Sequence, residues 1–453
     1  MKLIVAANRA PYQIKERKDS VTVEKSSGGL VAALDPIMRD CGGTWICSGN
    51  KTFEDYNLET PYKIKQIKLT KNENKHYYEG FCNTQLWPVF HYFPTRYKLH
   101  LNDWDYYRQV NQKFANQILD ILEPDDKIWI HDYQLMLVPK MLRDKGVTNK
   151  IGFFLHIPFP NLEIYKIFPK RKEILEGILG CDLIGVHTES YKKHLLESVS
   201  TFFPDLEIND EIINYKERDV KVKSMPISID FEQIDTMART DYVNSKTEEI
   251  KHYFKSEIIG LGVDRLDYTK GLVEKFEGIE AFLEKHPEYI KKLTFIQIAV
   301  PTRTNVPEYI NIKREVEETV GRINGKFSRD GWSPISYIYN NVKFNDLISY
   351  YRSADFILVS ALRDGLNLVA KEYIASKVND SGMLILSEFT GVAEELAPKS
   401  LINPYDSNSV SNAILKTFTA SEEEKTKLMS DARDYVKNNN IYVWVDKFLE
   451  LLE

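Results

Sequence analysis

The chain has 453 residues and a formal net charge of −6, with 43% hydrophobic and 28% charged residues. This length exceeds what one ordinary hydrophobic core holds, so we expect two domains. The composition is typical of a soluble globular protein. The acidic balance argues against nucleic acid as a partner, because such binding needs a broad basic surface, although a local cationic pocket is compatible with it.

The cysteines and the apolar runs indicate a cytoplasmic protein. The N-terminal apolar run stops at Asn8, which is too short for a secretion signal, and no run approaches the length of a membrane span. No C-x-x-C pair occurs, and no cysteine lies near histidines at zinc-ligand spacing, so we expect buried thiols. The cysteines are Cys41, Cys47, Cys82 and Cys181.

Short apolar runs alternate with helical patterns in the first half of the chain. Several of these runs are apolar on consecutive residues, which is typical of parallel strands covered on both faces. Residues 104–122 have the periodicity of an amphipathic helix. The longest stretch without a pattern runs from Arg9 to Ser27, and we expect an irregular loop there. The expected strands are residues 3–8, 44–49, 63–69, 127–132, 151–156 and 183–188.

The same rhythm starts again after a connecting segment, residues 220–230. The predicted fold class is therefore α/β, with two Rossmann-like, doubly wound domains that face each other across a cleft. We place the domains at residues 1–228 and 229–436, and expect residues 437–453 to form a helix that packs back on the N-terminal domain. The expected strands of the second half are residues 257–264, 293–300, 335–340, 355–360 and 383–388.

Polar and charged residues follow successive predicted strands. For any one of them an ordinary ion pair is the more common explanation, but together they favour a ligand site, because parallel strands end at one edge of a sheet. They are Asn8, Arg9, His131, Asp132, His156, Asp264, Arg265, Arg303, Asp364 and Gly365.

The turn "DRLDYTKGL" directly follows a buried strand. Its cations, Arg265 and Lys270, suit a phosphate or diphosphate. The alternative is that Asp264 and Asp267 only neutralise them on the surface. The position of the turn, ending at Gly271, favours the site, and we expect the two aspartates to hold the cations in place.

Two further segments fit a nucleotide sugar. Gly28 and Gly29 in "SSGGL" lead into a helical run whose first amides suit an anion, although many such pairs are only turns. In "DGLNLVAKEY", a helix that starts near Asn367 places Glu372 one turn inside, where a carboxylate suits ribose hydroxyls. The alternative for Asp364 and Glu372 is a helix cap and a surface carboxylate.

No segment predicts a metal site or a cofactor. The D-x-D at residues 103–105 opens the helix expected over 104–122, so helix capping is the preferred interpretation. The histidines show no pairwise spacing typical of metal ligands.

Several long motifs resemble the trehalose-6-phosphate synthase family, glycosyltransferase family 20: "GVDRLDYTKGL", "IWIHDYQLMLVP", "IGFFLHIPFP", "GRINGKF", "RDGLNLVAKEY" and the N-terminal "NR…SSGGL". The resemblance runs from about Leu3 to the C-terminal helix. It implies a GT-B fold and a retaining, metal-independent transfer of glucose from a nucleoside-diphosphate glucose, expected to be UDP-glucose, to glucose 6-phosphate. A separate phosphatase would then act on the product. The resemblance leaves open whether the chain forms a homo-oligomer.

The resemblance also assigns roles to residues. The N-terminal domain would bind the acceptor and the C-terminal domain the nucleotide sugar. Arg265 and Lys270 would bind the donor diphosphate, Glu372 its ribose, and Asp364 and His156 would orient the transferred glucose. The other implied donor residues are Gly28, Gly29, Val342, Leu368, Val369, Ala370 and Lys371, and the implied acceptor residues are Arg9, Trp45, Tyr77, Trp87, Asp132 and Arg303.

Two other functions stay open at this stage. One is a related transferase on the same scaffold, such as a glucosylglycerol-phosphate synthase, because two arginines fit any phosphorylated acceptor. The other is a non-catalytic regulatory relative, which the presence of Arg265, Lys270, His156, Asp364 and Glu372 disfavours.

Overall fold

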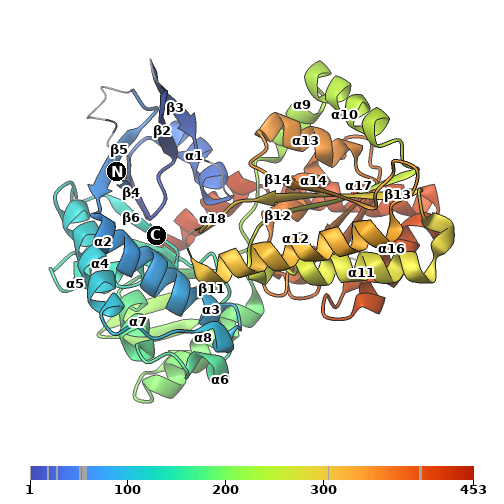
Figure 1. The fold of residues 1–453 in the computed structure, drawn as a ribbon. Helices are drawn as coiled ribbons and strands as arrows, with labels where there is room; N and C mark the ends of the chain where they lie inside the picture. Colours follow the sequence, from blue (N-terminus) through green and yellow to red (C-terminus); the bar gives the residue numbers. More distant parts are fainter. Residues whose placement is uncertain are drawn as a thin grey trace. The chain divides into compact units, whose positions relative to one another are not determined.

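The structure is a computed structural model that describes residues 2–17, 20–26, 29–49, 53, 59–304, 306–396 and 400–453. It separates into two compact units (Figure 1). Unit 1 comprises Met1–Ile227 and Tyr442–Glu453, and unit 2 comprises Ser228–Ile441. The boundary expected after residue 228 lies beside this division, and the expected return helix overlaps the C-terminal part of unit 1.

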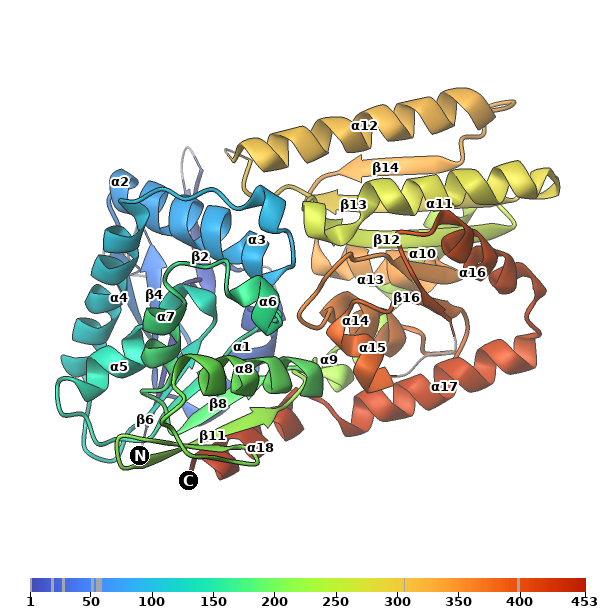
Figure 2. The ribbon, with the colours of Figure 1, turned by 90° about the horizontal axis from the view of Figure 1, so that it is seen from below.

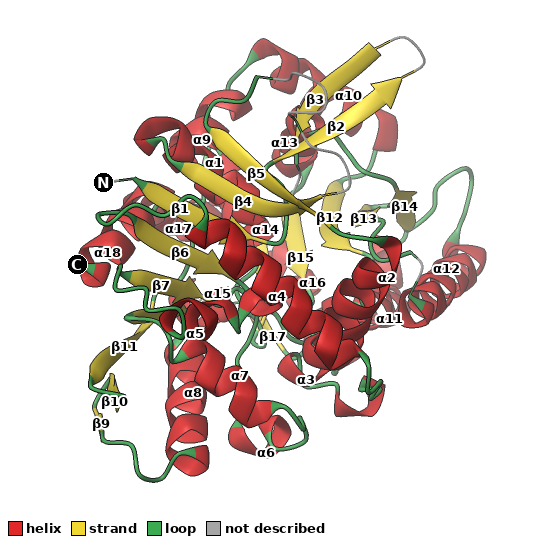
Figure 3. Ribbon diagram, turned by 90° about the vertical axis from the view of Figure 1, so that its left-hand side faces the viewer, coloured by secondary structure: helices red, strands yellow, loops and turns green. Residues whose placement is uncertain are grey.

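Unit 1 is built on a mostly parallel sheet. Within the described residues its strand order is β5-β4-β1-β6-β7-β8-β11-β10-β9, and Figure 3 labels the strands of this order except β8. β10 runs antiparallel to both of its neighbours, β11 and β9, and the other strand pairs described in this sheet are parallel. The strands are β1 (Leu3–Ala7), β4 (Thr44–Gly49), β5 (Lys63–Lys68), β6 (Lys127–His131), β7 (Ile151–Phe154), β8 (Leu183–Val186), β9 (Ile208–Asn209), β10 (Ile212–Tyr215) and β11 (Arg218–Ser224).

The buried character of β1, β7 and β8 follows from their composition. Every residue of these strands is buried, as expected for parallel strands covered on both faces. The helices of unit 1 are α1 (Gly29–Cys41), α2 (Lys71–Glu73), a π-helix (Asn74–Leu86), α3 (Trp87–Phe90), α4 (Asp103–Leu119), α5 (Val138–Arg143), α6 (Leu162–Tyr165), α7 (Arg171–Ile178), α8 (Glu189–Phe202) and α18 (Ile441–Leu452), with 3₁₀ turns at Pro94–Arg96 and Tyr133–Leu135.

Several segments of unit 1 differ from the sequence-based expectation, among them β9 and β10, where no strand was expected. The stretch expected to be an irregular loop holds an antiparallel hairpin, β2 (Tyr12–Arg17) and β3 (Ser20–Lys25). The segment expected to connect the halves contains part of β11, which pairs with β8. The π-helix Asn74–Leu86 has no counterpart in the prediction, because π-helices are rare and have no simple periodic signal.

Helix α18 packs on the sheet of unit 1 (Figure 2). The ring of Phe448 stacks on Trp129 with 4.3 Å between centroids. Gly152 leaves room for this contact, since a Cβ there would lie 2.5 Å from a ring carbon of Phe448. Lys221 of β11 donates to the Leu451 carbonyl at 3.1 Å. The last helix of the chain therefore completes the hydrophobic core of the first unit.

Unit 2 has a parallel sheet in the order β14-β13-β12-β15-β16-β17. Figure 1 shows α11 and α12 on one side of it and α9, α10 and α13 on the other. The strands are β12 (Ile258–Arg265), β13 (Leu293–Val300), β14 (Ile335–Tyr339), β15 (Phe356–Val359), β16 (Met383–Ser387) and β17 (Leu401–Ile402). The helices are α9 (Phe231–Ala238), α10 (Asp241–Phe254), α11 (Leu272–Lys285), α12 (Pro307–Phe327), α13 (Phe344–Ser353), α14 (Leu368–Ser376), α15 (Gly391–Leu396), α16 (Ser407–Thr419) and α17 (Glu422–Asn438), with 3₁₀ turns at Tyr268–Lys270 and Pro287–Tyr289.

The alternating strands and helices of both units confirm the predicted α/β class. None of the described helices combines the length and the apolar character that crossing a bilayer requires.

Candidate active site

The charged residues of unit 2 lie at the carboxyl ends of three neighbouring strands. Arg265 is the last residue of β12, Arg303 follows β13, and Asp364 follows β15. Lys270, in the turn after β12, brings its Nζ to 2.6 Å from Asp364 Oδ2. We call these four residues, with Asp267, the strand-end cluster of unit 2.

Asp267 is the centre of this cluster and has no exposed surface. Its Oδ2 lies 3.2 Å from Arg303 Nη1 and 4.0 Å from Arg265 Nη2, and it accepts a hydrogen bond from Tyr309 at 3.1 Å. The other oxygen accepts from the Thr269 amide at 3.1 Å. Burial alone would raise the pKa of Asp267, but the charges of Arg303 and Arg265 outweigh it and lower the pKa. The carboxylate therefore stays ionised and holds two arginines.

Asp264 has a different partner, although it directly precedes Arg265. Its Oδ2 lies 2.5 Å from Nζ of Lys275, which is fully buried, and accepts from Gln297 Nε2 at 3.1 Å. Gly262, two residues earlier in β12, makes room for this group, because a Cβ there would lie 2.7 Å from Lys275 Nζ. The expectation that both aspartates hold the site cations is thus wrong for Asp264, which neutralises a core lysine.

Gly271 ends the turn with a left-handed backbone, at φ 60°. A Cβ at this position would lie 2.3 Å from the Ser360 carbonyl oxygen. Both restrictions favour glycine, so the turn that carries Lys270 is fixed tightly against the end of β15.

Helix α14 begins at Leu368, next to the predicted start. Asn367 caps it, accepting from the Ala370 amide at 3.2 Å and donating to Asp364 Oδ2 at 2.9 Å. Because Ala370 is already capped, the amides of Leu368 and Val369 are the first-turn donors best suited to an anion.

The next two side chains of α14 have separate environments. Lys371 is fully buried, and its Nζ pairs with Glu395 at 2.7 Å, so its side chain points into the protein. Glu372 is half-buried and accepts a hydrogen bond from the Tyr351 hydroxyl at 2.9 Å. Burial raises the pKa of Glu372 to about 7, although the Tyr351 hydrogen bond opposes this.

The polar residues of unit 1 also gather at strand ends. Asn8 follows β1, and its Oδ1 accepts from the hydroxyls of Tyr77 at 3.0 Å and Ser48 at 3.1 Å. Tyr77 is fully buried within the π-helix. Its hydroxyl therefore orients Asn8.

Asp132 and His156 connect the ends of β6 and β7. Asp132 accepts from the His156 amide at 3.2 Å, and its own amide donates to the Phe154 carbonyl at 2.7 Å. The ring of His156 is bonded to that of His131, with 3.0 Å between Nε2 and Nδ1.

Three residues in these loops have a left-handed backbone that side chains rarely adopt. They are Asp132 at φ 74°, Arg303 at φ 47° and Asn367 at φ 92°. Strained positions of this kind concentrate at functional sites, where the surrounding structure holds them. The strain supports a functional role for the strand ends of both units.

The chain is similar to a known family over its whole length. The sequence profile of glycosyltransferase family 20 matches residues 1–453. The chain belongs to glycosyltransferase family 20. Its fold is accordingly GT-B, with two Rossmann-like domains.

Two relatives illustrate the similarity in sequence. The alpha,alpha-trehalose-phosphate synthase [UDP-forming] of Candida albicans is 39% identical, over 100% of this chain and 97% of its own length. The 56 kDa subunit of the enzyme with the same description from Saccharomyces cerevisiae is 38% identical, over 99% of this chain and 94% of its own length.

Two solved structures illustrate the similarity in fold. A trehalose-6-phosphate protein from E. coli bound with UDP-2-fluoro glucose has a TM-score of 0.91 and 33% identity, and the match covers 100% of this chain and 99% of that one. An alpha,alpha-trehalose-phosphate synthase (UDP-forming) from Burkholderia xenovorans in complex with glucose-6-phosphate has a TM-score of 0.91 and 31% identity, and covers 100% of both chains.

The remaining residues that the family 20 resemblance assigns have the following positions. Gly28 lies outside the described residues, and Gly29 is the first residue of α1, as expected for a pair that leads into a helix. Val342 is half-buried in the loop between β14 and α13, and Arg9 is exposed.

Both tryptophans of the implied acceptor site are packed inside unit 1. Trp45 has no exposed surface, and its ring stacks with Tyr62 at 6.2 Å. Trp87 is 4% exposed and stacks on His91 at 3.9 Å. Trp45 would therefore act on an acceptor only through the packing around it.

The prediction for the D-x-D segment is wrong in detail. The N-cap of α4 is Asn102, without a side-chain hydrogen bond. The buried Asp103 instead contacts His76 Nδ1 at 2.7 Å and accepts from Gln85 at 3.2 Å. In the part of the chain that the structure describes, no group of three or more histidine, cysteine, aspartate or glutamate residues is placed to hold a metal ion.

Three residues with central contacts were not predicted: Lys275, Tyr309 and Tyr351. Tyr309 lies 42 positions from Asp267, and Tyr351 lies 21 positions from Glu372. No local pattern marks such pairs, because each forms only when elements that are distant in the sequence pack together.

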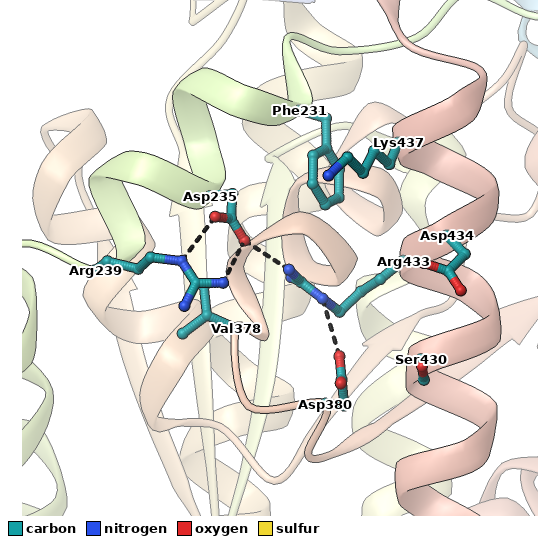
Figure 4. Close-up of a pocket in the computed structure, with 9 residues that line it drawn as sticks. All are labelled: Phe231, Asp235, Arg239, Val378, Asp380, Ser430, Arg433, Asp434 and Lys437. Atoms are coloured by element: carbon teal, nitrogen blue, oxygen red, sulfur yellow. Dashed lines mark hydrogen bonds and ion pairs between the residues drawn. The ribbon is translucent and has the colours of Figure 1, made fainter.

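A cavity of about 240 Å³ lies away from these strand ends, beside α9 and α17 of unit 2 (Figure 4). Arg433 dominates it, with ion pairs to Asp235 at 2.6 Å and Asp380 at 3.0 Å. Arg239 also pairs with Asp235, at 2.7 Å. The paired charges indicate a role in joining the helices to the loop of Asp380.

Proposed function

We propose that this protein is a retaining glucosyltransferase that moves glucose from UDP-glucose to glucose 6-phosphate and forms α,α-trehalose 6-phosphate. One observation carries the proposal: a cationic strand-end cluster in unit 2 of a chain that is 39% identical to a UDP-forming synthase over its whole length. The relatives are described as UDP-forming, which supports uracil as the base of the donor.

The residues that bind the donor must stabilise a leaving diphosphate. Negative charge gathers on that group as the anomeric bond breaks, and preorganised cations and amides stabilise it, typically as the largest catalytic effect. Arg265 and Lys270 supply the cations, while Asp364 holds the Lys270 ammonium in place. The first amides of α14 add donors, and Glu372 accepts from the ribose hydroxyls.

The acceptor side needs groups for a sugar and for a phosphate. We assign Asp132, Tyr77 and Trp87 of unit 1 to the sugar and its surroundings, with Trp45 behind them. Arg9 and Arg303 are the cations proposed for the acceptor phosphate, and His156 orients the transferred glucose.

We propose that the acceptor hydroxyl attacks the anomeric carbon from the face that the diphosphate leaves. The new carbon–oxygen bond forms as the bond to the phosphate oxygen breaks, and that oxygen takes the proton of the hydroxyl. Asp364 is engaged by Lys270 and Asn367, which makes it a poor nucleophile. Trapping a glycosyl group on any side chain would overturn this mechanism.

The proposal also covers the conditions of the reaction. We propose that it needs no metal and no cofactor, since the arginine and lysine supply the positive charge. We further propose a cytoplasmic protein whose product is dephosphorylated by a separate enzyme. Full activity in excess chelator would support the proposal that no metal is needed. A control reaction that lacks either substrate should show no activity.

The test is one assay with crossed substrates. Purified protein is mixed with UDP-, GDP- or ADP-glucose and with glucose 6-phosphate, glucose or glycerol 3-phosphate, and release of the nucleoside diphosphate is measured. We expect UDP-glucose with glucose 6-phosphate to react fastest and to give a product in which NMR shows both anomeric carbons in the α configuration. Preference for glycerol 3-phosphate would assign the related transferase, and no release with any pair would overturn the enzymatic proposal.

A further inference from the structure

Three histidines lie together beneath the strand ends of unit 1. His131 and His156 are joined through their rings, at 3.0 Å, and the ring of His187 lies 5.5 Å from that of His156. His187 accepts a long hydrogen bond from the Ile227 amide at 3.4 Å. The roles discussed above use His156 and leave His131 without a part in the reaction.

Both joined rings are neutral at physiological pH. Burial lowers the pKa of His131 and of His156 well below the usual value, and His156 lowers that of His131 further while His187 lowers that of His156. A neutral imidazole has one N–H and one bare nitrogen. The contact between Nδ1 of His131 and Nε2 of His156 therefore contains one proton, and the position of that proton sets the tautomer of both rings.

The second ring nitrogen of His131, Nε2, indicates whether His131 or His156 donates in this hydrogen bond. His131 is fully buried, and its Nε2 has no hydrogen-bond partner among the described residues. If His156 donated, His131 Nε2 would carry a buried N–H with nothing to accept it, and orphaned buried N–H groups are rare. If His131 donates, its Nε2 is a bare nitrogen instead.

Trp129 adds a second, independent reason. It lies two residues before His131 on the same face of β6, with 4.7 Å between ring centroids. Its Nε1 is also buried without a partner in the described part of the chain, and an indole nitrogen can only donate. No hydrogen bond joins this donor to His131 Nε2 among the described residues, so an N–H on His131 Nε2 would leave two neighbouring buried donors unpaired, whereas a bare Nε2 leaves one.

We infer that His131 is a positioning residue that fixes His156 as a neutral donor, with the proton of His156 on Nδ1. The His131 Nδ1–H donates to His156 Nε2, so the remaining nitrogen of His156 carries an N–H. No other hydrogen bond of the His156 ring occurs among the described residues, and this side chain is half-buried rather than buried.

This inference deepens the proposed function and rests on it for the ligand. A neutral N–H donor suits an oxygen of a sugar hydroxyl and excludes a role for His156 as the base that accepts the proton of the acceptor. It also avoids adding a positive charge beside the anomeric carbon, where positive charge develops as the leaving group departs.

The first measurement is the tautomer itself, in the full-length protein labelled with ¹⁵N-histidine. Long-range ¹H–¹⁵N NMR separates protonated from bare ring nitrogens, and His156→Asn identifies the signals of His156. We expect protonated Nδ1 and bare Nε2 on both His131 and His156. Protonated Nε2 on both rings, or a charged His156 near pH 7, would overturn the inference.

The second measurement is kinetic. His131→Asn keeps an amide donor near the position of Nδ1, whereas His131→Leu has none. We expect His131→Leu to lower kcat about tenfold with little change in KM for glucose 6-phosphate, since one neutral hydrogen bond is lost. His131→Asn should restore most of kcat, and equal losses in both variants would reduce His131 to a packing residue.

The two proposals fail in different ways. If wild-type protein shows the expected tautomers but transfers no glucose, the proposed function is wrong and the assignment of the proton stands. If it transfers glucose with the opposite tautomers, the proposed function stands and the role of His131 is wrong. If His131→Leu does not fold, the NMR measurement on the wild-type protein still decides.

Discussion

The residues at the strand ends of the two units differ in charge. In unit 2 the groups are ions, with Arg265, Arg303 and Lys270 balanced by two carboxylates. In unit 1 they are mostly neutral, with His131 and His156 uncharged. The difference matches the chemistry proposed for each side, since a leaving diphosphate needs cations and a sugar needs neutral donors and acceptors. One sheet architecture therefore supports two kinds of site, and what differs is whether the side chains at its edge carry charge.

The largest effect we expect is on stability, and it separates the core of unit 2 from its cluster. Asp264→Asn leaves the fully buried Lys275 ammonium unpaired, so the free energy of unfolding should fall by about 3–5 kcal/mol. Since burial already lowers the pKa of Lys275, this loss should shrink as pH rises and the lysine becomes neutral. Chemical denaturation at several pH values measures it.

The matched control removes both charges. Asp264→Asn combined with Lys275→Met should regain most of the lost stability, because no uncompensated charge remains in the core. Turnover per folded molecule should stay within about twofold of the wild-type value in both variants. A loss of turnover without a loss of stability would return Asp264 to the catalytic cluster.

The largest effect on activity should follow from Arg265→Ala. Loss of one preorganised donor to the leaving diphosphate should lower kcat by roughly a hundredfold or more. Stability should change little, because the Arg265 side chain is 41% exposed. Arg322→Ala, at an exposed ion pair of α12, is the control and should leave kcat unchanged. Near-wild-type turnover in Arg265→Ala would make the turn an ordinary surface ion pair.

A smaller effect should distinguish Asp267 from Asp264. Asp267→Asn keeps the shape but removes the charge that holds Arg303 and Arg265, so both arginines lose their fixed positions. We expect kcat/KM to fall about tenfold, with a higher KM for glucose 6-phosphate if Arg303 binds its phosphate. Initial-rate kinetics with each substrate varied in turn measure this. Similar kinetic parameters for Asp267→Asn and Asp264→Asn would show that the two aspartates do not have separate roles.

The smallest effect concerns pH and Glu372. Burial raises the pKa of Glu372 to about 7. The protonated carboxyl therefore stabilises the folded state, fully so below the ordinary pKa of glutamate, and this stabilisation is lost as pH rises through 7. Ribose hydroxyls donate to the ionised form, so UDP-glucose should bind more weakly below pH 7, by at most about tenfold per pH unit. Calorimetry in buffers of different ionisation enthalpy should detect proton release on binding.

Glu372→Gln is the control for that measurement. It cannot ionise, so its affinity for UDP-glucose should be flat across the same pH range, without proton release. Tyr351→Phe removes the hydrogen bond to the Glu372 carboxyl group and should shift the midpoint upward, because that bond lowers the pKa. An unchanged pH profile in Glu372→Gln would assign the titration to another group.

Much of this organisation could be predicted from the sequence. Consecutive apolar residues followed by a charged turn identified β12 and the position of Arg265 at its end, because parallel strands are buried on both faces and end at one edge. The predicted strands of both units and the start of α14 agree with the structure. The hairpin β2–β3 was missed, because polar and charged residues make up most of both strands.

The sequence by itself determined which chemistry the chain possesses, namely cations at the ends of β12 and β13, a carboxylate after β15 and histidines at the ends of β6 and β7. Only the tertiary structure decided which of these groups pair. Adjacent residues of a strand point to opposite faces, so Asp264 turns to Lys275 of α11 while Arg265 is directed otherwise. Asp267 meets Arg303 because β12 and β13 lie side by side, and Lys371 meets Glu395 because α14 packs against its neighbours. Such pairings depend on packing across tens of residues, and no local pattern in the chain records them.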